Sequence, residues 1–352
     1  MPTSSHQRAW LYFLLFLAIA VNFSGLFVVL LGADGPLYAS IARTMVEKGN
    51  YVELFSHGTD WLDKPHFPFW ATALSFEVFG FTTWAYKLPA ILFLLLGVWY
   101  AYLLARKLYN EKTAYWAVII LLTAQHIVIS NNDVRAEPYL TGLIIGSIYH
   151  FYRSYTEKKN WQLILGSLFA ACAIMTKWPF AIIPIAGAIG GELLFKKNWQ
   201  QLFHLRWLIA ALLIFLFITP ELYCLWYQFD QHPEKLVFGR TGVSGIRFFF
   251  WDSQFGRFLN TGPIKGKGDP AFFLHTLIWA FLPWSLVLYM ALVRIWQKRW
   301  RRSAQHVEWL SLSGAFITLL VFSLSKFQLP HYSNIIFPLL AILLSGYLQQ
   351  VK

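Results

Sequence analysis

Residues 84–105 read WAYKLPAILFLLLGVWYAYLLA, a long apolar run whose only charged residue is Lys87. A helix rises about 1.5 Å per residue, so a run of this length crosses the roughly 30 Å hydrocarbon core of a bilayer. The basic pair Arg106 and Lys107 follows directly. The stretch therefore predicts a membrane-spanning helix that ends in a short basic loop.

Further apolar runs of roughly twenty residues follow the same pattern along the chain. The protein is 57% hydrophobic and only 13% charged, whereas soluble domains carry roughly 25% charged residues. Because a spanning segment must satisfy its own backbone hydrogen bonds, we predict an all-α polytopic bundle forming one transmembrane domain over residues 1–352. About ten spans are predicted, at 10–31, 84–105, 113–131, 138–153, 160–176, 178–195, 206–226, 271–295, 308–326 and 331–349.

The orientation follows from the basic residues, which gather in short loops between these runs. The basic loops are 106–112, 153–159, 196–206 and 298–302. Short loops rich in Lys and Arg stay in the cytoplasm, so we predict a cytoplasmic N-terminus in the cell (inner) membrane. The net charge of +12 is then a sign of topology, and no nucleic-acid partner is expected.

Two long loops, 32–83 and 227–270, are predicted outside. In the first, Leu37, Ile41 and Met45 form one stripe of an amphipathic interfacial helix over 36–48. A second, aromatic interfacial helix is expected over 65–80, with Pro65 as its first residue. The loop 227–270 has glycines on both sides of an aromatic run, which suits a lid over a lipid-facing cavity.

Ionisable and polar residues at the outer ends of the spans are the candidates for function, because charge near hydrocarbon is costly and tends to be functional. We expect these side chains, from six distant segments, to meet in one extracytoplasmic pocket. They are Asp34, Asp63, Lys64, Asp133, Arg135, Glu137, Lys177, Asp252, Arg257, Lys326, His331 and Tyr332.

Several of these candidates also have a structural interpretation. Asp34 is either the cap of an interfacial helix or a general base. Lys64 is either a phosphate ligand or a lysine paired with its neighbour. The segment 133–137 is either part of the site or a solvated turn. Arg257 has the fork geometry that matches phosphate, and Lys177 and Lys326 are either snorkelling lysines or further groups around an anion.

Six sequence markers occur in order along the chain. They are Asp34 with Tyr38-Ala39-Ser40-Ile41-Ala42-Arg43, Asp63-Lys64-Pro65, Lys87-Leu88-Pro89, Met175-Thr176-Lys177-Trp178-Pro179, Leu282-Pro283-Trp284, and Lys326 to Tyr332. With these markers the chain resembles the GT-C membrane glycosyltransferases, in particular the superfamily of the lipid A aminoarabinose transferases (ArnT-like) and the protein O-mannosyltransferases (PMT).

The resemblance implies roles for individual residues. Asp34 and Glu137 match the catalytic acids, although Gly35 follows Asp34 where many relatives have a second acid, and Glu137 stands where the lipid A enzymes have Asp. The groups matched to the donor phosphate are Lys64, Arg257, Tyr332 and, in the same last marker, Lys326. Supporting roles fall to Tyr38, Asp133, Arg135 and Lys177.

A metal site is the one cofactor to consider. Asp63 matches a carboxylate that binds metal in the family, and Asp252 stands at the place of its partner, where relatives have histidine. No cofactor is assigned with certainty, and a divalent metal is the one candidate. The family usually continues into a soluble C-terminal domain, which we expect to be absent from this chain.

The sequence thus predicts an enzyme of the glycosyltransferase class that moves a hexosyl or pentosyl group, with inversion, from a polyprenyl-phosphate donor to an extracytoplasmic acceptor. The acceptor is lipid A, another glycan or a protein. No dinucleotide fingerprint or P-loop points to a nucleotide sugar. The alternative is a transporter or flippase of a lipid-linked anionic glycan, for which repeats and charges at the midplane would be expected.

Overall fold

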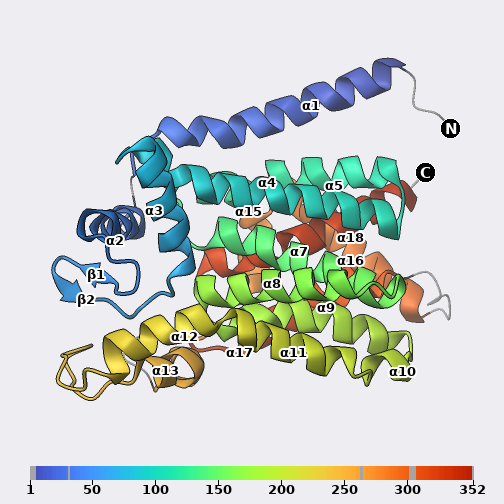
Figure 1. Cartoon of the computed structure of the whole chain (residues 1–352). Helices are drawn as coiled ribbons and strands as arrows, with labels where there is room; N and C mark the ends of the chain where they lie inside the picture. Colours follow the sequence, from blue (N-terminus) through green and yellow to red (C-terminus); the bar gives the residue numbers. More distant parts are fainter. Residues whose placement is uncertain (1–4, 31, 262–264, 301–306, 351–352) are drawn as a thin grey trace.

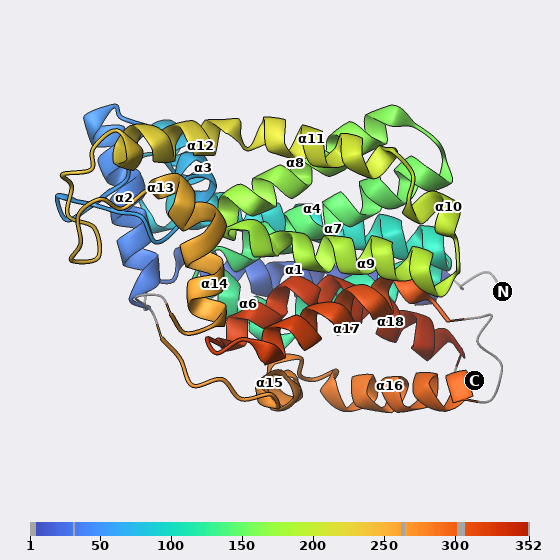
Figure 2. The same cartoon turned by 90° about the horizontal axis from the view of Figure 1, so that it is seen from below.

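The computed structural model describes residues 5–30, 32–261, 265–300 and 307–350, without the side chains of 5–8, 257 and 298–300. Long helices run side by side through the bundle (Figures 1 and 2), which confirms the predicted all-α polytopic fold. The start of α1 and the end of α18 lie at one end, and the two long loops gather at the other (Figure 1). We call this second end the loop end.

The bundle consists of helices that follow the predicted apolar runs. They are α1 (Ser5–Ser24), η1 (Gly25–Phe27), α4 (Thr83–Leu108), α5 (Glu111–Thr123), α6 (Gln125–Asn132), α7 (Glu137–Thr156), α8 (Asn160–Lys177), η2 (Pro179–Ala181), α9 (Ile182–Phe195), α10 (Trp199–Leu202), α11 (Arg206–Phe217), α15 (Phe272–Ala280), α16 (Ser285–Trp300), α17 (Trp309–Leu324), η6 (Pro330–Ile336) and α18 (Phe337–Gln350).

The loop end is built from shorter elements. The first long loop contains α2 (Asp34–Lys48), the antiparallel hairpin of β1 (Phe55–Ser56) and β2 (Thr59–Asp60), and α3 (Phe67–Phe79). The second contributes α12 (Thr219–Leu225), the π-helical turn η3 (Trp226–Asp230), α13 (Gly245–Arg247), the π-helical turn η4 (Phe248–Asp252) and α14 (Ser253–Phe258).

Four of the described helical stretches are long and apolar enough to cross a membrane, and a fifth appears if the bent pair α5 and α6 is one span. The four are Ala9–Phe27, Thr83–Leu108, Trp199–Phe217 and Pro330–Gln350. Helices occupy all ten predicted ranges, but several are shorter or less apolar. The expectation of about ten spans therefore stays a prediction, whereas several spans are established.

Some predicted runs are interrupted. The run 113–131 bends by 53° between α5 and α6, and 206–226 breaks at Ile218, two residues before Pro220. The run 271–295 breaks between α15 and α16, next to Pro283, and the two helices run in different directions (Figure 2). Proline lacks an N–H and its ring clashes with the preceding turn, which explains the last two breaks.

The aromatic helix of the first long loop begins later than predicted. It starts at Phe67, and Pro68 occupies its first turn, so Pro65 lies before the helix. The reason is tertiary: the backbone N–H of His66 donates to Glu221 Oε2 at 3.0 Å instead of facing solvent at a helix start. This contact anchors the residue that immediately precedes the helix.

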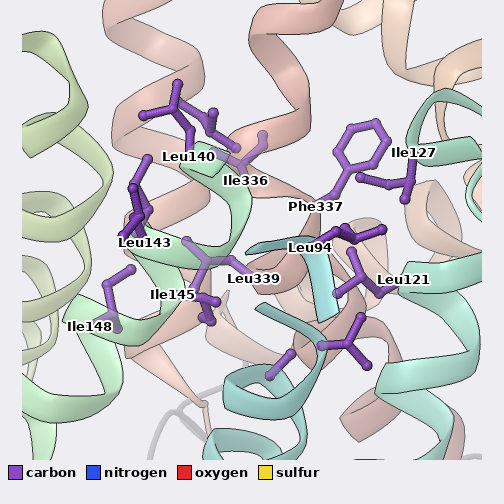
Figure 3. Close-up of a cluster of buried hydrophobic side chains, with 14 of the residues drawn as sticks. Leu94, Leu121, Ile127, Leu140, Leu143, Ile145, Ile148, Ile336, Phe337 and Leu339 are labelled. Carbon is purple, nitrogen blue, oxygen red and sulfur yellow. The ribbon is translucent and has the colours of Figure 1, made fainter. Parts of the chain in front are cut away.

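The main core lies along α7, η6 and α18 and includes Leu140, Leu143, Ile336 and Phe337 (Figure 3). Helices α4 and α7 approach so closely that a Cβ at Gly142 would lie 2.1 Å from the carbonyl oxygen of Phe93. Small residues at such crossings are typical of membrane helices, which associate mainly by packing. By contrast, apolar side chains on α1 and α11 are exposed, as expected for surfaces that face lipid.

A second, smaller apolar cluster lies under the loop end. It includes Leu62 of the first long loop, Trp178 between α8 and η2, and Phe248 and Phe249 of the second long loop. This cluster joins the two long loops to the end of α8, and it positions the residues described next.

Candidate active site

A polar cavity of about 200 Å³ lies at the loop end of the bundle. Its wall comes from five segments that are far apart in the sequence. The lining residues are Asp34, Tyr38, Asp63, Lys64, Arg135, Ala136, Glu137, Lys177, Phe327, Leu329, His331 and Tyr332. The structure thus brings together most of the acidic and basic residues singled out in the sequence.

Several of the side chains that line the polar cavity lie at helix ends. Asp34 is the first residue of α2, Glu137 the first of α7, and Lys177 the last of α8. Lys64 lies between β2 and α3, and Tyr332 in the 3-10 helix η6 before α18. Because helix ends lie at the boundary of the apolar bundle, charged groups there can face a cavity without crossing hydrocarbon.

One arginine fixes the carboxylate of Asp34. Arg135 Nη1 lies 2.8 Å from Asp34 Oδ2, while Nε and Nη2 of the same guanidinium lie 3.1 and 2.9 Å from Asp133 Oδ2. The cap of α2 is Ala33, so Asp34 is not the helix cap that the sequence allowed. Asp34 is 39% exposed and can therefore be reached from the cavity.

The approach of Asp133 to the chain before α2 depends on a glycine. A Cβ at Gly32 would lie 2.3 Å from Asp133 Oδ1, which no side chain at that position could accommodate without displacing the carboxylate. Two residues before Asp34, the backbone is therefore packed directly against the Asp133 and Arg135 pair.

Glu137 and Lys177 form a buried ion pair beneath the cavity. The ammonium of Lys177 donates to Glu137 Oε1 and also lies 4.1 Å from the centre of the Tyr332 ring. His331 Nε2 lies 3.7 Å from the same Glu137 oxygen. The Glu137 side chain is only 2% exposed, so 133–137 is not a solvated turn.

Asp63 and Lys64 pair with each other in the cavity wall. The residue two positions after Lys64 anchors this segment: His66 Nδ1 lies 3.0 Å from Glu221 Oε1 and Nε2 lies 3.0 Å from the carbonyl oxygen of Val52. Both His66 and Glu221 are buried. Helix α12 thus anchors the loop segment that carries Lys64.

A second clamp holds the same loop. The side-chain amide of Gln228 accepts from the backbone N–H of Leu54 at 2.9 Å and donates to its carbonyl at 2.8 Å, as a neighbouring strand would. Lys235 adds ion pairs to Asp60 at 2.9 Å and to Glu53 at 3.3 Å. The two long loops therefore form one assembly around the cavity.

Tyr38 contributes a hydroxyl to the wall. Its burial, with the nearby carboxylates of Asp34 and Asp63, raises the pKa of the phenol well above its usual value. The phenol consequently stays protonated and able to donate a hydrogen bond at neutral pH.

Among the side chains that the structure describes, the candidates Asp133, Asp252 and Lys326 are not in the cavity wall. Lys326 is exposed, and its backbone N–H donates to the carbonyl oxygen of Phe258 at 3.2 Å. Asp252 lies 3.6 Å from Arg247 in the second long loop. The backbone of Arg257 belongs to α14, but its side chain lies outside the described residues.

The metal prediction receives no geometric support from the described part of the chain. Within these residues no group of three or more His, Cys, Asp and Glu side chains is arranged to hold a metal ion. Asp63 lines the cavity beside Lys64, whereas Asp252 is not among the lining residues.

An apolar cavity of about 400 Å³ adjoins the polar one, and Phe327 and Tyr332 line both. Its other walls come from η2, α17 and the second long loop. The lining residues are Trp178, Pro179, Phe180, Ile183, Phe250, Ser253, Gln254, Phe255, Phe258, Val321, Phe322, Ser325, Phe327 and Tyr332.

Sequence reasoning missed several residues that shape the site. Glu221 is a carboxylate inside an apolar run, a signal that could have been used because buried charges in such runs are rarely incidental. His66 carried no comparable signal. Its importance follows from which partners the fold places against it.

Comparisons with known proteins agree with this architecture. The sequence profile of the family described as dolichyl-phosphate-mannose-protein mannosyltransferase matches residues 63–224. An uncharacterized protein of Aquifex aeolicus is 26% identical, over 88% of this chain and 58% of that protein. The undecaprenyl phosphate-alpha-4-amino-4-deoxy-L-arabinose arabinosyl transferase of Pseudomonas aeruginosa is 27% identical, over 93% and 57%. The chain thus spans less than two thirds of these relatives.

Solved structures show the same fold. The crystal structure of ArnT from Cupriavidus metallidurans bound to undecaprenyl phosphate has a TM-score of 0.82 at 22% identity, covering 98% of this chain and 61% of that protein. The oligosaccharyltransferase AglB from Archaeoglobus fulgidus has a TM-score of 0.64 at 12% identity, covering 99% and 51%. The chain is thus similar in sequence to protein mannosyltransferases over residues 63–224 and to arabinosyl transferases over most of its length, and it shares the fold of ArnT.

Proposed function

We propose that the chain transfers a sugar from a polyprenyl-phosphate carrier to an acceptor on the extracytoplasmic side of the membrane. The observation that carries the proposal is the pair of adjoining cavities. One is small, polar and rich in paired charges, and the other is larger and almost entirely apolar. A lipid-linked sugar phosphate has a polar sugar phosphate, which matches the polar cavity, joined to an apolar polyprenyl chain, which matches the apolar cavity.

Asp34 is the acceptor-activating group in this proposal. It lies in the polar cavity, is 39% exposed, and is held in place by Arg135 through one oxygen. In the reaction Asp34 takes the proton of the acceptor hydroxyl while the oxygen attacks C1 of the sugar. The bond between C1 and the phosphate oxygen breaks, and the phosphate leaves with the bonding electrons. A positioned base of this kind contributes about 10²–10⁴-fold in rate.

The basic groups of the cavity stabilise the departing phosphate. Lys64 and Tyr332 line the polar cavity, and we assign them to the phosphate together with Arg257, on the strength of the family resemblance for Arg257. Fixed positive groups aimed at a developing negative charge are usually the largest electrostatic term in catalysis. Lys326 receives no such role, because it is exposed outside the cavity wall.

Glu137 has a different role from Asp34. It is buried, paired with Lys177 and close to His331, so it is poorly placed to take a proton from an incoming acceptor. We assign Glu137 to holding the Lys177 ammonium beside the Tyr332 ring under the phosphate. The two acids of the predicted pair thus act differently.

The loop end faces the extracytoplasmic side in this proposal, with the N-terminus in the cytoplasm. The relatives named for arabinosyl transfer use an undecaprenyl phosphate sugar, and one solved ArnT structure contains undecaprenyl phosphate. A carrier of this class is the proposed donor here. Lipid A, another glycan or a protein is the proposed acceptor.

The test compares purified protein carrying Asp34→Asn or Lys64→Ala with two controls on the same helix as Asp34. Both site variants are expected to lose at least about 100-fold of transfer activity, in line with the loss of a base or an electrostatic group. Glu47→Gln and Lys48→Ala change a carboxylate and an ammonium of α2 outside the cavity and are expected to keep it. Mass spectrometry of envelope lipids and glycoproteins identifies the product.

Two results would refute the proposal. Full transfer by both site variants would remove the catalytic assignment. Movement of a lipid-linked glycan across liposomes without any new glycosidic bond would instead support the transporter alternative.

A further inference from the structure

Lys87, in the third of the six sequence markers, is a buried lysine that has no role in the reaction described above. It belongs to α4 and is 0% exposed. Its ammonium donates to the carbonyl oxygens of Gly25 at 2.8 Å and of Val28 at 2.7 Å. Because a charge inside an apolar helix is costly and tends to be functional, these two contacts require an explanation.

The two carbonyl groups lie where the first apolar helix ends. Helix α1 stops at Ser24, and η1 continues it over Gly25–Phe27. The last carbonyl groups of a helix lack the N–H donors of a following turn, and the end of the helix dipole there attracts cations. Lys87 supplies both donors and positive charge from a different helix. It therefore ties the end of α1 to α4.

This tie matters because α1 is held weakly elsewhere. Its side chains Trp10, Phe13 and Phe16 are 66%, 50% and 67% exposed, and the helix lies along the edge of the bundle (Figure 1). Near its end, the side-chain amide of Asn22 donates to the carbonyl oxygen of Leu122 at 2.9 Å. Polar contacts at the end of α1, more than apolar packing along it, thus determine where the following chain begins.

The chain that leaves this point leads directly to Asp34, which follows Val28 by six residues. Just before Asp34, the backbone is packed against Asp133 so closely that a Cβ at Gly32 would lie 2.3 Å from its Oδ1. Lys87 fixes the start of this short connection, and Asp133 fixes its end. A displacement at Lys87 therefore changes the position from which Asp34 enters the polar cavity.

We propose that Lys87 is a positioning residue for the transfer reaction, which places the Asp34 carboxylate by fixing the end of the first apolar helix. This inference rests on the proposed function, because it takes Asp34 as the base. The phosphate groups assigned to Lys64 and Tyr332 come from other segments of the cavity wall. Loss of the Lys87 ammonium should therefore slow transfer without weakening the carrier.

The test measures two quantities on purified Lys87→Met, which keeps the apolar stem and removes the charge. They are the affinity for undecaprenyl phosphate and kcat for transfer to the acceptor that mass spectrometry identifies. We expect kcat to fall about 10–100-fold, since a misplacement of about 1 Å can cost that much, and the affinity to stay nearly unchanged. Lys87→Arg, which keeps charge and donors, should recover part of the rate. Lys107→Met, in the last turn of α4, is the matched control and should keep both values.

A double variant separates positioning from general damage. In protein that already carries Asp34→Asn, Lys87→Met should cost no further rate, because no carboxylate remains to be placed. Losses that multiply in the double variant, or wild-type kcat in Lys87→Met alone, would overturn the inference and leave the proposed function standing. If Lys87→Met does not fold, Lys87→Gln, which keeps a donor without the charge, replaces it in the same comparison. A wild-type rate in Asp34→Asn would instead overturn the proposed function.

Discussion

At the scale of single residues, ion pairs between neighbouring side chains position the charged groups of the site. Arg135 contacts Asp34 with one nitrogen and Asp133 with two others. A lysine ammonium is a compact point charge without the planar fork, so it cannot reproduce the geometry of these three contacts. The position of Asp34 thus depends on the planar guanidinium as well as on its charge.

We predict that Arg135→Lys lowers kcat by about 10–100-fold, since a misplacement of about 1 Å can cost that much, and leaves the affinity for the carrier phosphate nearly unchanged. Steady-state kinetics and a lipid-binding assay measure the two quantities. Arg43→Lys, on the exposed face of α2, is the matched control. Equal loss of binding and rate would instead place Arg135 on the phosphate.

The buried pair of Glu137 and Lys177 allows a second prediction. Glu137→Gln leaves the Lys177 ammonium without its carboxylate, and Lys177→Met leaves the Glu137 charge without its ammonium. Breaking a buried ion pair at one partner costs about 3–5 kcal/mol. Each single variant is therefore expected to unfold at a clearly lower temperature than the wild type, measured in one detergent.

The double variant Glu137→Gln with Lys177→Met is expected to be more stable than either single variant, because no isolated charge remains. Strictly additive losses in the double variant would show that the two side chains do not act as a pair.

At the scale of elements, the position of Lys64 depends on a helix of the other long loop. Helix α12 presents Glu221 to both the backbone N–H and the ring of His66. The ring also faces the Val52 carbonyl, which can only accept, so Nε2 of His66 must carry a proton.

We predict that Glu221→Gln retains carrier binding, since the amide oxygen still accepts from the backbone and the amide nitrogen can donate to a neutral imidazole. Glu221→Leu leaves buried donors without an acceptor, at about 1–3 kcal/mol each, and should weaken carrier binding together with stability. Lipid affinity and thermal unfolding are measured on both variants. Equal behaviour of Gln and Leu would contradict a positioning role.

The sequence predicted these elements unevenly. The interfacial helix expected over 36–48 is observed as Asp34–Lys48, because its stripe of apolar residues is a local signal. The start of the aromatic helix was placed too early at Pro65, because the hydrogen bond between His66 and Glu221 joins residues 155 positions apart. Pro220 and Pro283 were signals of helix breaks in the sequence. The predicted spans missed these breaks because they were chosen by apolar length alone.

At the scale of the whole molecule, the loop end lies opposite the start of α1 and the end of α18 (Figure 1). A topology prediction follows. With Cys172 and Cys224 replaced by alanine, Thr59→Cys at the exposed start of β2 should react with a membrane-impermeant thiol reagent in cells whose outer barrier is open. Lys158→Cys, between α7 and α8, should react only after the inner membrane is opened. The reverse pattern would invert the orientation.

The sequence predicted those residues of the site that are charged and lie at the end of an apolar run. Asp34, Lys64, Glu137 and Lys177 stood out because each is charged at the end of an apolar run, and the fold brings them into one cavity. The same criterion also selected Lys326, which the fold leaves exposed. Charge at a span end says which residues are near the surface, but only packing decides which way each side chain faces.

The second apolar cluster joins Leu62, Trp178 and Phe248, three residues from segments remote in sequence. Leu62 precedes Asp63 and Lys64, and Trp178 follows Lys177, so a change of volume at any one of the three shifts groups on both sides of the site. During evolution these positions should accordingly substitute in concert. Their effects on fitness should be epistatic, with a replacement harmful in one background and neutral where its neighbours have already changed.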